Sequence, residues 1–204
     1  KILADKLHFF GAYETTDSPR FLAIGFDGSG NGVERDWLSQ SDYERILNIS
    51  NSVYGYDPGG QPTDGVQEQD KQMLKLDWKV NPSHNVALIY NYYDGFQDRN
   101  SDGDDDEFEF ANHFYVKGAE SETVTARLSS QWTDAFSTEV FLSTNSMDDS
   151  QVTVGPKDQA DHQIDIFGDG TVYVGADDSR QANALNTKSN FIKLAGQYLA
   201  GRHV

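Results

Sequence analysis

Hydrophobic and polar residues alternate along much of this chain, most clearly in its middle third. In residues 72–80 (QMLKLDWKV) the apolar positions Leu74, Leu76, Trp78 and Val80 fall on every second residue. Residues 85–92 and 123–132 repeat this pattern. Successive side chains of a strand point to opposite faces, so a period of two predicts strands that each have one apolar face.

The connections between the predicted strands are alternately short and long. Short turns are predicted near residues 5, 82, 134 and 202, and long loops at 15–69, 94–106 and 145–188. Transmembrane β-barrels have short turns on one side of the membrane and long loops on the other. The sequence therefore predicts an all-β fold, an antiparallel up-and-down transmembrane β-barrel segment with short periplasmic turns and long extracellular loops. Residues 1–204, with about six long strands, are expected to form part of one barrel domain.

The first long loop contains the one helix that the pattern predicts, near residues 36–53. Ser41 is expected to be its N-cap, with Glu44 completing a capping box. One side of the helix is then apolar, formed by Ile46, Leu47, Ile49 and Val53.

Composition narrows the classes of function. The net charge of −17 argues against nucleic acid as a partner, because binding phosphates requires clustered Lys and Arg. No run of about 18 apolar residues is present, which excludes a transmembrane helix but not a β-barrel. Cysteine is absent, so disulfides and thiolate metal sites are excluded. Aromatic residues near the predicted strand ends suit an interfacial girdle: Trp78, Tyr90, Tyr92, Trp132 and Tyr198.

Residues 98–109 (DRNSDGDDDEFE) match the spacing of an EF-hand calcium loop, with Gly103 at the sharp turn. The flanking segments read as strands, so a whole EF-hand is not expected. The alternative is a solvated acidic loop tip. The candidate calcium ligands are Asp98, Asn100, Asp102, Asp104, Asp106 and Glu109.

Other candidate chemistry is sparse. Asp177 and Asp178 lie close to Arg180, and this charge cluster is expected to structure its loop rather than to bind a ligand. Asp161 and His162, beside Asp165, could form a metal site, which only their proximity in the sequence suggests, and the five histidines otherwise read as ordinary turn or strand residues. No nucleophile elbow, P-loop or dinucleotide fingerprint is present, so no catalytic residues are predicted and the chain is not expected to be an enzyme.

Four segments resemble TonB-dependent outer-membrane receptors of the Oar-like subgroup. Residues 5–14 (DKLHFFGAYE) are similar to an early barrel strand of that family, and residues 75–85 (KLDWKVNPSHN) to its LDW-x-(I/V)-N-x-x-H hairpin. Residues 41–59 resemble an extracellular loop through the stretches SDY and VYGYDPG. Residues 175–185 (GADDSRQANAL) resemble the segment G-(P/A)-D-x-x-R-x-A-N-x-L.

The resemblance implies a receptor in the bacterial outer membrane that takes up a ligand through a 22-stranded barrel with a plug domain and a TonB box. About six strands correspond to roughly a quarter of such a barrel. The implied partners are outer-membrane lipid, and the plug domain and TonB complex through other parts of the polypeptide. Both ends of the chain read as a strand end or a turn, so an internal piece of a longer polypeptide is expected.

A second reading remains open from the sequence. A secreted or surface β-rich binding module with calcium-stabilised acidic loops accounts for the negative charge and for the calcium motif. It does not account for the regular alternation of short turns and long loops.

Overall fold

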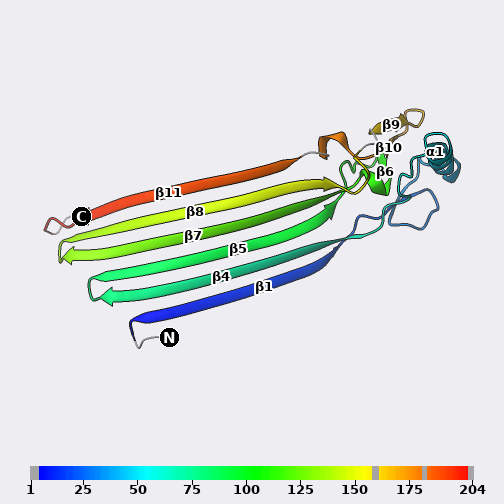
Figure 1. Cartoon of the computed structure of the whole chain (residues 1–204). Coiled ribbons are helices and arrows are strands. Elements are labelled where there is room, and N and C mark those ends of the chain that lie inside the picture. The colour runs from blue at the N-terminus through cyan, green and yellow to red at the C-terminus, as the bar shows by residue number, and fades with distance from the viewer. Residues whose placement is uncertain (1–4, 158–160, 181–182, 202–204) are drawn as a thin grey trace.

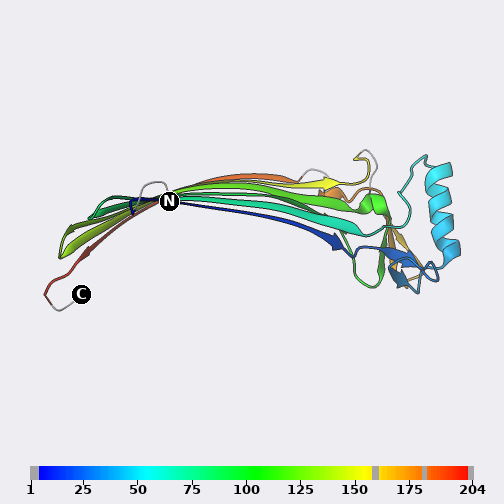
Figure 2. The same cartoon turned by 90° about the horizontal axis from the view of Figure 1, so that it is seen from below.

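A long curved β-sheet dominates the computed structural model, and a small globular head sits at one end of it (Figures 1 and 2). The structure describes residues 5–157, 161–180 and 183–201. The six strands of the sheet are antiparallel, in the order β1-β4-β5-β7-β8-β11. Their bounds are β1 (Leu7–Arg20), β4 (Gly65–Asn81), β5 (His84–Arg99), β7 (Tyr115–Thr133), β8 (Phe136–Thr153) and β11 (Ala184–Tyr198).

Both two-residue turns of the sheet lie at the end away from the head, which is called the turn end below (Figure 1). Side chains stabilise each turn: Asn81 Oδ1 accepts a hydrogen bond from the amide of Ser83 at 2.8 Å, and Thr133 Oγ1 accepts one from the amide of Phe136 at 3.1 Å. The other connections of the sheet pass through the head. The predicted alternation of short turns and long connections is therefore confirmed in the described residues.

The strands are longer than the periodicity predicted. β1 continues to Arg20 rather than ending at Glu14, and β5 continues to Arg99, inside the expected second loop. The added residues are mostly polar on both faces, so they carry no alternation from which a strand could be read. Ladder hydrogen bonds to long neighbouring strands hold them extended.

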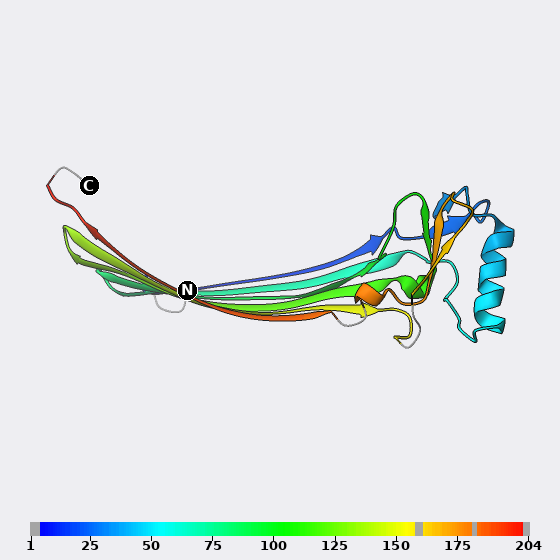
Figure 3. The ribbon, with the colours of Figure 1, turned by 90° about the horizontal axis from the view of Figure 1, so that it is seen from above.

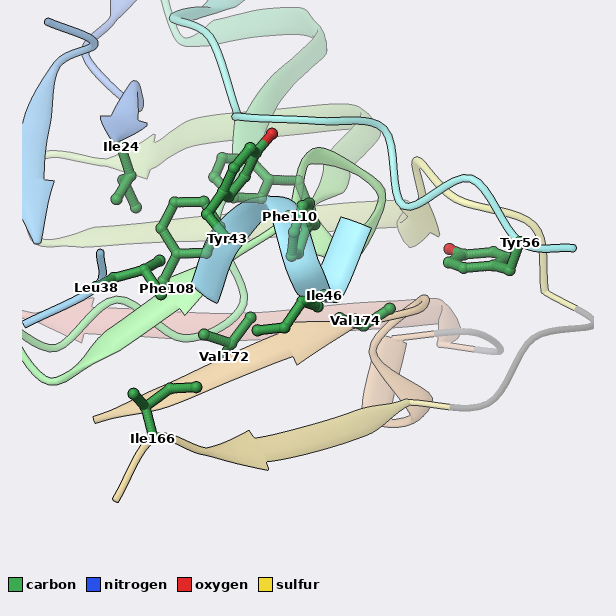
Figure 4. Packing of buried hydrophobic residues seen from close by; sticks show 11 residues of the cluster. Ile24, Leu38, Tyr43, Ile46, Tyr56, Phe108, Phe110, Ile166, Val172 and Val174 are labelled. Atoms are coloured by element: carbon green, nitrogen blue, oxygen red, sulfur yellow. The ribbon is translucent and has the colours of Figure 1, made fainter. Parts of the chain in front are cut away.

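The head is built from the long connections and has its own hydrophobic core (Figure 4). Its elements are β2 (Ile24–Phe26), β3 (Val33–Arg35), α1 (Gln40–Ser52), β6 (Glu107–Glu109), the 3-10 helix η1 (Ala111–His113), β9 (His162–Asp165), β10 (Thr171–Val174) and η2 (Asp178–Arg180). β10 pairs in parallel with β6 and antiparallel with β9, so β9 and β10 form a small hairpin within the long connection. The core contains Ile24, Leu38, Tyr43, Ile46, Tyr56, Phe108, Phe110, Phe114, Ile166, Val172 and Val174.

The start of α1 differs from the prediction. Ser39, not Ser41, is the N-cap, and its Oγ accepts the amide hydrogen of Asp42 at 3.2 Å. Asp42 Oδ2 in turn accepts the hydroxyl of Ser39, at 2.6 Å. The apolar side is also shifted, because Tyr43 and Ile46 are buried whereas Val53 is 70% exposed.

The fold class is therefore a mostly β protein with a six-stranded antiparallel sheet of long strands. Within the described residues the sheet is open, with β1 and β11 as its edge strands (Figure 1). None of the described helices combines the length and the apolar character needed to cross a membrane.

Candidate functional site

One face of the long sheet is apolar over its half nearer the turn end. Within the part of the chain that the structure describes, no other layer covers this face (Figure 3). The register places residues of the six strands directly opposite one another in rows. One row contains Leu7, Trp78, Val86, Leu128, Val140 and Leu194. The next row toward the head contains Phe9, Leu76, Leu88, Ala126, Leu142 and Ile192. Every strand thus contributes an apolar side chain to both rows, which form the centre of what we call the apolar face.

Aromatic residues bound this apolar face at both ends, and a row of charges follows on the head side. Trp132 and Tyr198 lie toward the turn end, where they are 56% and 68% exposed. Tyr13 and Tyr92 share a row on the head side. The following row toward the head places four carboxylates on adjacent strands: Asp70, Asp94, Glu120 and Asp148.

The side chains of the apolar face form a band across the six strands, and this apolar band is inclined to the rows of the sheet. On β1 it runs from Leu7 to Tyr13, but on β11 it runs from Ile192 to Tyr198. Ile192 lies in the row of Phe9, so the band is displaced by four residues toward the turn end between β1 and β11. Four residues correspond to ~13 Å along a strand, and five strand spacings to ~24 Å. The band is therefore inclined by ~30° to the rows.

The opposite face, called the polar face here, carries paired charges and hydroxyl groups. Glu139 accepts hydrogen bonds from Arg127 and, at 3.1 Å, from Lys193, which links three neighbouring strands. Thr125 and Ser143 bond through their hydroxyls at 3.0 Å. The rings of Phe141 and Phe191 also pack together on this face, with their centres 5.7 Å apart. The polar face thus mixes paired polar groups with aromatic rings, whereas the central rows of the apolar face are apolar on every strand.

A second candidate site lies in the head, where three loops meet. Asp102 follows β5, His113 ends η1, and Asp177 precedes η2. Each contributes one potential ligand atom, and these atoms all lie within 4.8 Å of one another. His113 is fully buried, Asp177 is 6% exposed, and the Asp102 side chain is 35% exposed. This Asp102–His113–Asp177 group, called the head cluster below, has the ligand types that bind divalent metals.

Both ring nitrogens of His113 have oxygen neighbours. Nδ1 lies 2.8 Å from the carbonyl oxygen of Gly175, and Nε2 lies 3.0 Å from Asp102 Oδ2. A carbonyl oxygen only accepts, so Nδ1 must carry the hydrogen of that bond. In the neutral ring Nε2 then presents its lone pair to the carboxylate of Asp102.

One further carboxylate lies beside the head cluster. Asp161 Oδ1 is buried and makes no hydrogen bond within the described part of the chain, and it lies 3.8 Å from His113 Nδ1. Burial works against ionisation of Asp177, but hydrogen bonds from the hydroxyl and amide of Ser179 outweigh it and lower the pKa of that carboxyl. The carboxylates therefore outnumber the cationic groups around this histidine.

Glu109 stabilises the loop that carries Asp102. Its carboxylate oxygens accept the amides of Ser101 and Asp102 at 2.9 and 2.8 Å. Burial raises the pKa of Glu109 to about 8, although the amide of Ser101 works in the opposite direction. Two fixed acceptors thus hold the backbone on which Asp102 approaches His113.

The structure separates the two ends of the predicted calcium loop. Asp98 lies within β5, and its Oδ2 accepts the amide of Val66 at 2.8 Å. Glu109 lies in β6 and binds backbone amides instead. Both carboxylates that would begin and end an EF-hand ligand set therefore already serve as acceptors within the protein.

The middle of that loop is more open. Asn100 donates through Nδ2 to the carbonyl oxygen of Asp102 at 2.6 Å, while Asp104 and Asp106 are exposed. Of the six predicted ligands, Asp102 alone belongs to the head cluster. Calcium binding by this loop stays a prediction.

Sequence reasoning missed His113 and Asp177 as partners of Asp102. They lie far apart in sequence, with β7 and β8 between them, so no local motif connects them. The weak proximity of Asp161 to His162 pointed to this region, but the structure brings Asp161 to His113 instead. Only the meeting of three loops in the head produces the cluster.

The predicted loop-structuring residues do lie together. Arg180 Nε is 3.6 Å from Asp177 Oδ2, and the guanidinium lies over the ring of Tyr115 at 5.0 Å from its centre. Arg180 also donates to Gln151 at 3.3 Å, whereas Asp178 begins η2. These contacts join the loop to β7 and β8, and the structuring role itself stays a prediction.

Comparisons with known proteins place no constraint on either site. The chain matches no protein-family model, no curated protein and no solved structure.

Proposed function

We propose that this chain is a section of the wall of an outer-membrane β-barrel of TonB-dependent receptor type, which takes up a ligand across the outer membrane. The observation that carries the proposal is the uncovered apolar face, bounded by aromatic residues and then by charges. A sheet that folds in water buries its apolar face against a second layer. In a membrane, lipid chains take the place of that layer.

The height of the band fits a bilayer. On β7 the band extends from Val124 to Trp132, which is eight residue steps or ~26 Å along the strand, and ~23 Å in height for a band inclined by ~30°. Transmembrane barrels have an outward apolar band about 25 Å tall, flanked by aromatic girdles. Residues of the band are extensively exposed, for example Leu194 at 75%.

The inclination of the band supports the same function. Strands of a closed barrel tilt by about 35–45° relative to the barrel axis, so a membrane crosses them obliquely. An apolar band perpendicular to the axis must then drift along the strands from one to the next. The drift of ~30° across this sheet has the direction of such a tilt and is somewhat smaller than its usual size.

The positions of the turns, the head and the polar face agree with a sheet that spans the membrane. The turn end would face the periplasm, and the acidic rows and the head would stand outside the membrane. The polar face, with its Arg127–Glu139–Lys193 group, would line the lumen. The edge strands β1 and β11 must pair with other strands, because lipid satisfies no backbone hydrogen bond. The nature of the ligand and the coupling to TonB rest on the sequence resemblance.

Paired cysteine variants test this proposal, because the chain has no cysteine of its own. Ala126 lies on the apolar face, and Ala87 on the polar face of the neighbouring strand. Ala126→Cys and Ala87→Cys are therefore the same substitution on opposite faces. Each variant of the intact parent protein would carry a nitroxide spin label, in the membranes of the cells that make it.

The expected result is that the label at position 126 collides with oxygen, which concentrates in lipid, and is shielded from a water-soluble nickel chelate. The label at position 87 should not show this preference. Equal access of the chelate to both labels would overturn the membrane assignment and favour a water-exposed β-rich binding module.

A further inference from the structure

We propose that Asp102, His113 and Asp177 bind a divalent transition-metal ion of the Zn²⁺ type, which ties together three loops of the head. This inference concerns the head alone and does not depend on whether the sheet lies in a membrane. It also differs from the predicted calcium loop, because it requires a histidine and an aspartate that lie outside residues 98–109.

The first argument is the orientation of His113. Its Nδ1 donates to the Gly175 carbonyl oxygen at 2.8 Å, which leaves Nε2 pointing toward Asp102. Histidine ligands of metals almost always donate their other ring N–H to a carbonyl or carboxylate, which fixes the tautomer and aims the lone pair. The ring is fully buried, so this aim is held by packing.

The second argument is charge. A neutral His113 would place a lone pair 3.0 Å from an oxygen of Asp102, with Asp177 also within reach. Asp161 Oδ1 is buried beside the ring without a hydrogen-bond partner in the described residues. Arg180, with Nε 3.6 Å from Asp177 Oδ2, and a protonated imidazole would together offset two of these three carboxylates and leave one uncompensated. A divalent cation offsets two and turns the contact between lone pairs into coordination.

The third argument is geometry. Ligands of a tetrahedral zinc ion at about 2.0–2.2 Å lie roughly 3.3–3.6 Å from one another. The three ligand atoms here already lie within 4.8 Å of each other, so small side-chain rotations complete the set. Because the Asp102 side chain is 35% exposed, water can reach the cluster and occupy a fourth position.

The ligand types select the class of metal. Imidazole suits Zn²⁺, Cu²⁺, Fe²⁺ and Ni²⁺, whereas Ca²⁺ and Mg²⁺ prefer sets of oxygen ligands. A site with one buried imidazole and two carboxylates therefore favours a transition metal over calcium. The bound ion would join the β5–β6 loop to η1 and to the β10–η2 loop, and so would order the head.

Calorimetric titration with ZnCl₂ tests the site in the intact parent protein, after chelator treatment and dialysis. Wild type should bind Zn²⁺ saturably. His113→Gln should weaken or remove one site, by at least the roughly 10–100-fold that loss of a supporting partner costs. His84→Gln, at the turn end, is the matched control and should bind like wild type.

Asp102→Asn guards against the failure of His113→Gln to fold, because Asp102 is partly exposed and the change is isosteric. Circular dichroism of the metal-free variants confirms folding, and Asp102→Asn should also lose affinity at least tenfold. Absence of zinc binding to wild type would overturn the proposal. So would an unchanged zinc affinity in both folded variants, or binding of Ca²⁺ alone. None of these outcomes bears on the spin-label test of the sheet.

Discussion

Leu128→Arg is the substitution that most directly tests the role of the apolar face. Leu128 lies on β7 four residues from Val124 and four from Trp132, the two ends of the apolar band on that strand. Each half of the band is therefore ~13 Å long, and Leu128 lies at its midpoint. Val86 and Val140 are its direct neighbours in the row.

The expected cost follows from that position. An arginine on the lipid face of a transmembrane barrel costs about 2–4 kcal/mol at the bilayer midplane and falls to about 0–1 near the interfaces. Leu128→Arg should therefore lower the free energy of unfolding by about 2–4 kcal/mol, or roughly 30- to 700-fold in the folding equilibrium. On a water-exposed surface, replacing a side chain that is 38% exposed should stay within about 0.5 kcal/mol.

The matched control is Ser129→Arg, one residue further along the same strand. Ser129 lies on the polar face opposite Glu139, which already binds Arg127 and Lys193, so the new charge gains no free partner, but it stays hydrated on this face and should cost little. The assay is urea unfolding of the parent protein in lipid vesicles, followed by tryptophan fluorescence. Equal stability of the two variants would refute the reasoning that one face meets lipid.

Three further predictions concern the head. Phe108→Ala should destabilise the head by about 3–5 kcal/mol, because this fully buried ring contacts two other aromatic rings. Phe21→Ala is the control and should have little effect, because its side chain is 86% exposed. Hydrogen exchange of the head amides measures both effects. Ser39→Ala should cost about 1 kcal/mol through loss of the N-cap, and a similar loss in Ser41→Ala would contradict the observed cap. Arg180→Ala should speed proteolysis of the loop before β11, because it removes an ion pair and a cation–π contact that together contribute about 1 kcal/mol. Unchanged cleavage would count against a structuring role.

The strands could be predicted wherever one face is apolar. Residues 72–80 and 85–92 alternate, and the structure pairs them as a hairpin with that alternation on a single face. The prediction failed to extend β5 through Asp98 because the strand ends near the head are polar on both sides. A strand that neighbouring strands stabilise by hydrogen bonds leaves no hydrophobic period to detect.

The head could be predicted only in part. The helix was expected from its spacing, but its cap moved to Ser39, since two serines so close together offer equivalent local signals. The acidic segment drew attention to Asp102 through its spacing, yet the structure directs Asp98 and Glu109 to backbone amides. Local motifs show which potential metal-binding side chains a segment contains, but not which of them lie close together in the folded protein.

The sequence by itself determined the long antiparallel strands, their apolar face and the alternation of turns and loops, because each follows from residues close together in the chain. Only the tertiary structure decided the rest. It aligned the strands in a register that makes one continuous inclined band, and it brought His113 next to Asp102 and Asp177. Both depend on segments far apart in sequence, and sheet pairing and core packing, rather than spacing, set their separation.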